Sequence, residues 1–104
     1  MLQNKGTFKT RVRAWARKMG VDIKTISIRK MASKWASYTQ SNRLVIFDSE
    51  LLAMEKGLSD YVIVHELLHG IVLNHGKLWK ALLISYIPDW EKRDKELKHH
   101  LRGK

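Results

Sequence analysis

The chain has no cysteine among its 104 residues, a single proline, and no apolar run as long as a membrane span. The lack of cysteine excludes a disulfide-stapled scaffold and every thiolate metal site, so histidine and carboxylate side chains remain as the strong metal ligands. Apolar stretches such as Ala81–Ile84 are far shorter than the ~20 residues that a transmembrane helix needs. The basic N-terminus lacks the apolar core of a signal peptide, so we expect a cytoplasmic protein without membrane contact.

Acidic residues are scarce in the first half of the chain. Residues 1–47 hold eleven Lys and Arg but only one acid, Asp22, whereas residues 48–104 hold nine basic and nine acidic residues. The whole formal net charge of +10 therefore arises in the first half. Nucleic acid bound through this basic half is one interpretation, and a solvated basic surface is the other.

The apolar pattern of the first half predicts a helix followed by a small sheet. Apolar residues at helical spacing predict a helix over residues 8–19 that ends at Gly20. Alternating, β-branched segments predict three strands, and a polar turn joins the last two as a hairpin. These strands are expected at residues 23–30, 33–39 and 44–48.

The sequence pattern predicts that the second half is helical. Asp48 or Ser49 would cap a short helix that ends at Gly57, and Ser59 would begin a mostly apolar, buried helix. Two further helices are expected, one that begins after Asn74 and continues to about Tyr86 and one from Asp89 onwards, with Pro88 between them. We therefore expect one α+β domain over residues 1–104.

The predicted buried helix contains an HExxH motif, His65-Glu66-Leu67-Leu68-His69. Two imidazoles four residues apart lie on one helix face and can bind one metal ion. Glu66 is rotated by about 100° and can instead take a proton from a metal-bound water, as in metal hydrolases. An exposed, salt-bridged helix face is the alternative, but these polar residues interrupt an apolar run, where a metal would compensate their burial.

His75 is the candidate for a third ligand. On an unbroken helix it would lie out of reach of His69, but Gly70 and Asn74 offer a place where the helix can end and the chain can bend. Three histidines and a water would form an open, catalytic type of zinc site. The alternative is that His75 simply begins the next helix.

Several separated motifs resemble the YgjP-like metallopeptidases, which are related to the WLM and SprT/Spartan-like proteases. The resemblance covers about Ile28 to Asp94 and rests on Arg29–Ser37, Asp60–His69, Asn74-His75, Trp79 and Pro88-Asp89-Trp90. It implies a zincin-like fold, zinc held by His65, His69 and His75, and hydrolysis of a polypeptide substrate with Glu66 as the base.

The resemblance also implies that the strand around Trp35–Thr39 borders the cleft, where an extended peptide could pair with it. The chain has Ala36 and Tyr38 where the family usually has glycine and cysteine. These two differences lie in the strand that would bind the substrate. They therefore weaken the inference about substrate binding more than the inference about the metal site.

Two other functions fit part of the pattern. YbeY-type zinc endoribonucleases share the His-x3-His-x5-His spacing, and the basic half would suit RNA phosphates, but that group typically has glycine where this chain has Glu66. A zinc-containing nucleic-acid- or protein-binding module would have no activity, and its metal would only stabilise the fold. The sequence favours the peptidase and leaves the physiological substrate and oligomeric state open.

Overall fold

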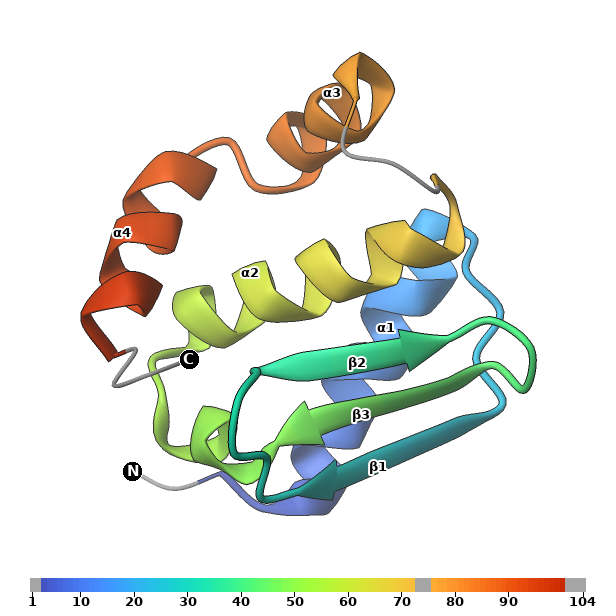
Figure 1. The fold of residues 1–104 in the computed structure, drawn as a ribbon, viewed down its shortest axis with the longest axis vertical. Helices are drawn as coiled ribbons and strands as arrows, with labels where there is room; N and C mark the ends of the chain where they lie inside the picture. The colour runs from blue at the N-terminus through green and yellow to red at the C-terminus, as the bar shows by residue number, and fades with distance from the viewer. Residues whose placement is uncertain (1–2, 73–75, 101–104) are drawn as a thin grey trace.

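The computed structural model describes residues 3–72 and 76–100. The described elements, in chain order, are α1 (Lys5–Met19), β1 (Thr25–Arg29), β2 (Ala36–Thr39), β3 (Leu44–Asp48), the 3-10 turn η1 (Ser49–Ala53), α2 (Lys56–Leu67), the 3-10 turn η2 (Leu68–Gly70), α3 (Lys77–Tyr86) and α4 (Trp90–His100). Figure 1 shows the sheet on one side and the C-terminal helices on the other. The expected α+β class is confirmed.

The three strands form one sheet in the order β1-β3-β2. The predicted hairpin is present as the antiparallel pair β2–β3, in which Ser37 lies opposite Ile46. The sequence pattern did not reveal that β1 pairs with β3 in parallel, with Ile26 opposite Val45. Because β3 lies in the middle, β2 is an edge strand.

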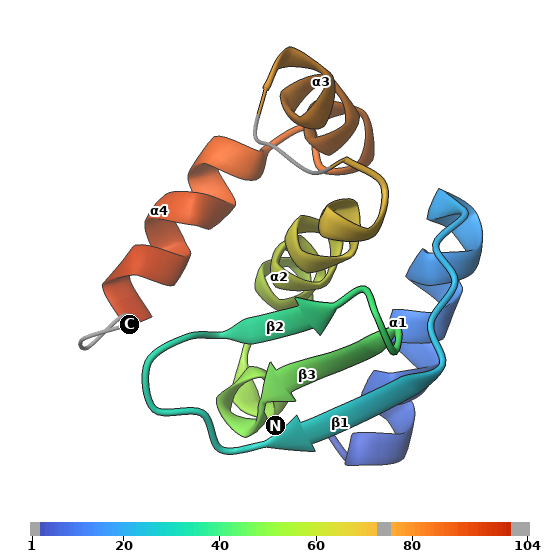
Figure 2. The same cartoon turned by 45° about the vertical axis from the view of Figure 1, so that its right-hand side comes forward.

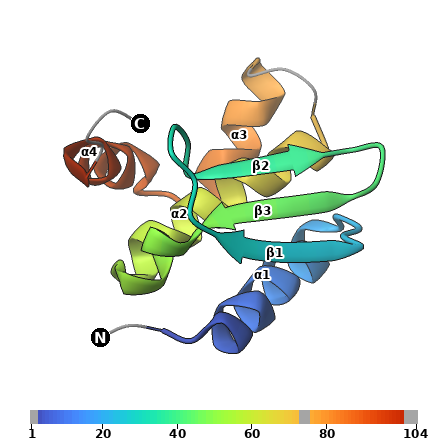
Figure 3. The ribbon, with the colours of Figure 1, turned by 60° about the horizontal axis from the view of Figure 1, so that its bottom comes forward.

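Both long helices of the first two-thirds of the chain lie on the same side of the sheet. Helix α1 crosses behind it on the β1 side, whereas α2 lies alongside β2 (Figures 1, 2 and 3). Apolar residues alternate along β1, where Ile26 and Ile28 are buried between exposed or half-buried neighbours. One face of the sheet therefore forms the core, and its edge at β2 borders α2.

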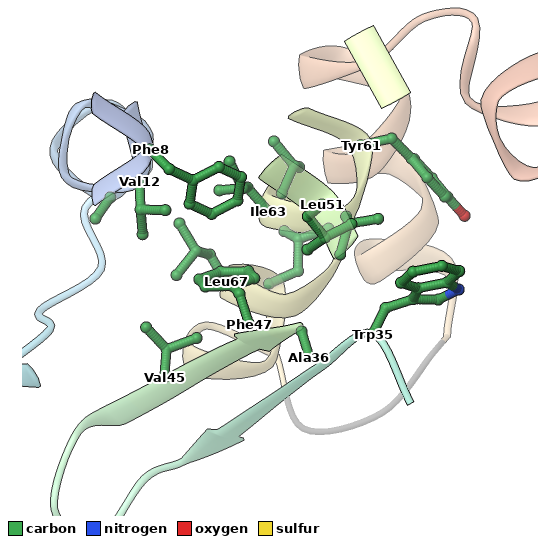
Figure 4. Packing of buried hydrophobic residues seen from close by; sticks show 14 of the residues in the cluster. Phe8, Val12, Trp35, Ala36, Val45, Phe47, Leu51, Tyr61, Ile63 and Leu67 are labelled. Atoms are coloured by element: carbon green, nitrogen blue, oxygen red, sulfur yellow. The ribbon is translucent and has the colours of Figure 1, made fainter. Parts of the chain in front are cut away.

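The core joins α1, the sheet and α2. Phe8 of α1 contacts Phe47 of β3 edge to face, with ring centroids 5.4 Å apart. Ile63 and Leu67 of α2 pack into the same cluster (Figure 4), and both are fully buried. The expectation of a central, buried motif helix is confirmed, because α2 contributes apolar side chains on most of its faces.

The ends of two elements follow the sequence signals. Helix α1 begins at Lys5, where the Asn4 side chain accepts a hydrogen bond from the Thr7 backbone N–H at 2.7 Å. It ends as predicted at Gly20, whose φ of 74° is left-handed and suits glycine. Asp48 caps the next element as expected, although this is the 3-10 turn η1.

The predicted starts of the later helices need correction. Helix α2 begins at Lys56, so Gly57 lies in its first turn and Ser59 is a fully buried residue within the helix. Ser59 does not begin the helix, because its Oγ donates to the Lys56 carbonyl and accepts from Arg11 of α1. Helix α3 begins at Lys77 rather than directly after residue 74, and residues 73–75 lie outside the described part of the chain. Within the described residues, no helix is long and apolar enough to span a membrane.

Candidate metal centre

The three residues of the motif lie together at the C-terminal end of α2. His65 and Glu66 are in the helix, which ends at Leu67, so His69 lies on the 3-10 turn η2. One potential ligand atom from each of the three side chains lies within 4.8 Å of the others. Two ligands at ~2.1 Å from one ion are at most about 4.2 Å apart. Small side-chain rotations therefore suffice for His65 and His69 to hold one ion, with Glu66 beside it.

Aromatic rings surround the first histidine. The centroid of the His65 ring lies 5.0 Å from that of Trp79, 5.7 Å from that of His69 and 5.8 Å from that of Tyr61, in each case edge to face. Trp79 belongs to α3, which follows residues 73–75 in the chain. This helix therefore packs over the motif. These contacts restrict the orientation of His65, which favours a preorganised metal ligand.

The second histidine is half-buried, and burial lowers its pKa below the ordinary value for histidine. A lower pKa favours the neutral imidazole, which is the form that binds a metal ion. The Gln40 side-chain amide donates to the His69 carbonyl at 3.3 Å and ties the turn η2 to the end of β2. Sequence reasoning did not identify Gln40, because its contact with His69 is long-range.

Gly70 follows the second histidine at a point of close approach. A Cβ atom on Gly70 would lie 3.0 Å from Val21 Cγ1 and 3.1 Å from the Tyr38 hydroxyl oxygen. The predicted end of the helix near Gly70 is confirmed, because η2 ends there. The structure adds the reason for a glycine, which is lack of space between β2 and the segment after α1.

The proposed third ligand, His75, lies outside the described residues. Its role as a ligand therefore stays a prediction. The described chain resumes at Gly76, immediately before α3.

Two hollows meet at the motif. A groove of about 490 Å³ runs between the edge strand β2 and the ends of α2 and η2, and its lining comprises Lys34, Ala36, Ser37, Tyr38, Gln40, Glu66 and His69. A second hollow of about 220 Å³ lies towards α4 and is lined by Lys34, Trp35, Ala36, Tyr61, Val62, His65, Glu66, Asp94 and Leu97. Lys34, Ala36 and Glu66 line both hollows, so the two adjoin at these residues.

Tyr61 forms a polar contact in the wall of the second hollow. Its hydroxyl donates to Asp94 at 3.0 Å. Burial raises the pKa of Tyr61 above its ordinary value, and the charge of Asp94 and this hydrogen bond raise it further. Tyr61 is therefore a neutral hydrogen-bond donor that joins α2 to α4.

Two solved structures are similar to this chain in fold. The metallopeptidase zymogen jannalysin of Methanocaldococcus jannaschii is 20% identical with a TM-score of 0.79, over 88% of this chain and 94% of that one. The zymogen abylysin of Pyrococcus abyssi is 15% identical with a TM-score of 0.78, over 90% of this chain and 94% of that one. These likenesses establish the fold.

The family follows from the sequence itself. None of the curated proteins that were compared matches the chain. The sequence profile of the YgjP-like metallopeptidase domain, however, matches residues 3–100. The chain therefore belongs to the YgjP-like family of metallopeptidase domains.

Proposed function

We propose that the protein is a zinc-dependent metallopeptidase in which Glu66 is the general base. The observation that carries this proposal is the cluster of His65, Glu66 and His69, whose potential ligand atoms lie within 4.8 Å of one another at the junction of two hollows. Membership of a metallopeptidase family supplies the reaction class.

The roles of the side chains follow from their chemistry. His65, His69 and His75 would hold the ion, and neutral imidazoles with an open fourth position suit catalytic zinc. When bound, zinc supplies a coordinated water with a pKa near 7 and polarises the scissile carbonyl. Glu66 would accept the proton of the attacking water and deliver it to the leaving amine.

The edge strand supports an extended peptide as the substrate. β2 pairs with β3 on one side only, and its other side borders the groove that contains Glu66 and His69. An extended chain can add to such an edge through backbone hydrogen bonds. Its scissile bond would then lie beside the Glu66 carboxylate.

Parallel digestion of denatured protein and single-stranded RNA by wild type and Glu66→Gln tests this function. We expect stoichiometric zinc in both proteins, cleavage of protein by wild type, and a loss of about 10²–10⁴-fold in the variant. Cleavage that survives Glu66→Gln would show that the base is assigned wrongly. Zinc-dependent RNA cleavage would support the nuclease, and zinc without either activity would support the binding module.

The basic half favours a second, separate role as a surface for nucleic acid. Helix α1 carries Lys5, Lys9, Arg13 and Arg17 at four-residue spacing and contains no acid. Such like-charge neighbours destabilise an isolated helix by ~0.2–0.5 kcal/mol per pair. A polyanion would neutralise them. Helix α1 lies behind the sheet (Figure 1), and none of these four residues lines the groove.

The salt dependence of binding to a double-stranded DNA oligonucleotide tests this role. Each phosphate contact contributes about −0.9 to the slope of log K against log salt concentration. We expect Arg13→Gln/Arg17→Gln to reduce the slope by roughly 1–2. The matched control is Lys92→Gln/Lys95→Gln, which removes the same charge from exposed positions on α4. Equal effects of the two variants would contradict a specific surface on α1.

A further inference from the structure

The hollow of about 220 Å³ adjoins the reacting groups on the side of α4. Its walls come from the start of β2, one face of α2 and the middle of α4. Figure 4 shows Trp35 and Tyr61 pointing to the same side, away from the packed centre of the core. His65 and Glu66 form part of its wall. A group bound in this hollow would therefore lie next to the peptide bond that is cleaved with Glu66 as the base.

Apolar side chains form most of the remaining wall. Trp35, Val62 and Leu97 are each buried in the core cluster and also face this hollow. A cavity of about 150 Å³ with aliphatic and aromatic walls binds benzene, so this hollow is large enough for a phenyl or branched aliphatic side chain. Burial against these walls would favour such a side chain by about tenfold or more over alanine.

The charged groups of the hollow disfavour a charged occupant. Two of them, Glu66 and Asp94, are acidic and would repel an acidic side chain. Asp94 already accepts from the Tyr61 hydroxyl and pairs with Lys98 Nζ at 2.9 Å, so it offers little to a basic side chain. Lys34 is exposed and lines both hollows, which places it at their shared rim.

We propose that this hollow is a specificity subsite that receives a large apolar side chain, such as Phe, Leu or Met, beside the scissile bond. The inference rests on the proposed peptidase function and names its substrate class. Leu97 is the residue that sets the depth of the subsite, because it enters from α4 and belongs to no element that carries the motif.

Cleavage-site profiling tests the proposal. Wild type, Leu97→Ala and Leu97→Trp digest the same peptide mixture, and mass spectrometry identifies the new termini. We expect wild type to enrich Phe, Leu and Met at one position next to the cut. Leu97→Ala should raise the acceptance of Trp, and Leu97→Trp should shift the preference at least tenfold towards Gly and Ala. The control is Leu78→Trp at a 61%-exposed position on α3.

A binding measurement separates this proposal from the proposed function. The Val62 methyl signals of the Glu66→Gln protein, which report on another wall of the hollow, are followed by NMR during titration with N-acetyl-phenylalanine amide or N-acetyl-aspartate amide. We expect a saturable shift with the phenylalanine compound only, and its loss in Leu97→Trp. Peptide cleavage with a flat residue preference, or a profile that Leu97 does not alter, would overturn the subsite. Absence of all cleavage by wild type would instead contradict the peptidase, while the NMR result would still decide whether the hollow binds apolar groups.

Discussion

The two halves of the chain differ in charge and in what they contribute to the site. The first half, residues 1–47, carries the whole net charge and supplies the edge strand. The second half is electrically balanced and supplies the motif helix and the helices that pack around it. Its charges pair locally: Arg93 alone contacts Glu55, Asp89 and Glu96. The proposed chemistry thus resides in the electrically balanced half, and the net charge belongs to the half that supplies α1 and the sheet.

Removal of the proposed metal ligands, which lie in the second half, is expected to have the largest effect on zinc binding and peptide hydrolysis. In His65→Ala/His69→Ala we expect loss of bound zinc and a fall in peptide hydrolysis of roughly a thousandfold or more, because both proposed ligands are gone. Metal analysis and an activity assay measure these effects. The matched control, His99→Ala/His100→Ala, removes two exposed histidines at the end of α4. Zinc retained in the first variant, or lost equally in both, would contradict the ligand assignment.

The apolar contact between α1 and the rest of the core is expected to have the second-largest effect. Phe8 is fully buried and packs on Phe47. We expect Phe8→Ala to lower the free energy of unfolding by about 3–5 kcal/mol, because it leaves a cavity in the shared core. Urea unfolding measures this change. Leu78→Ala at an exposed position should change the same quantity by less than about 0.5 kcal/mol, and similar losses would mean that Phe8 is not part of a close-packed core.

A partly buried ion pair that joins the two halves can be compared with an exposed ion pair within the first half. Arg11 of α1 binds Asp60 of α2, which also accepts from Trp15 Nε1 at 3.1 Å. These side chains are only 15% and 13% exposed, so we expect Asp60→Asn to cost about 2 kcal/mol of unfolding free energy. The exposed pair Arg43–Asp22 is the control.

Thermal or urea unfolding of Asp22→Asn should show a loss of at most about 0.5 kcal/mol, because water screens this pair. Equal losses in Asp22→Asn and Asp60→Asn would show that burial does not distinguish the two ion pairs.

A substitution at Gly70, where other side chains approach closely, should have the smallest effect on stability. This effect tests which atom excludes a side chain there. We expect Gly70→Ala to cost about 1 kcal/mol of unfolding free energy and to weaken zinc binding, because the added methyl group pushes η2 away from β2. Removing the crowding hydroxyl in Gly70→Ala/Tyr38→Phe should restore part of both quantities. Calorimetry and zinc titration measure them. If Tyr38→Phe brings no recovery, the Tyr38 hydroxyl is not the atom that excludes a side chain at position 70.

Local sequence signals predicted much of the fold, and long-range contacts account for what they missed. The helical spacing of α1, the glycine at its end and the hairpin strands depend on neighbouring residues, so the pattern was sufficient. The parallel pairing of β1 with β3 was not predictable, since no short motif encodes it. The start of α2 was misplaced at Ser59, because the partner that holds this buried serine is Arg11, far away in sequence.

In the site, too, local spacing was predictable from the sequence and long-range contacts were not. Spacing alone predicted that His65 and His69 would lie together, and the structure brings them together with Glu66. The Gln40 amide on the His69 carbonyl and the Trp79 ring beside His65 were not deduced as contacts, because each joins elements that are separated in the chain. The hollow lined by Leu97 was also not anticipated, since no sequence pattern links Leu97 to the motif helix.

The central position of β3 has a consequence for the order of folding. The hairpin aligns Thr39 with Leu44, whereas the parallel pair aligns Thr25 with the same Leu44, nineteen positions along the chain. Closing the shorter loop costs less chain entropy. The strand that borders the groove should therefore be in place before β1 docks, and a slow docking step would leave the half that carries the motif assembled on an incomplete sheet.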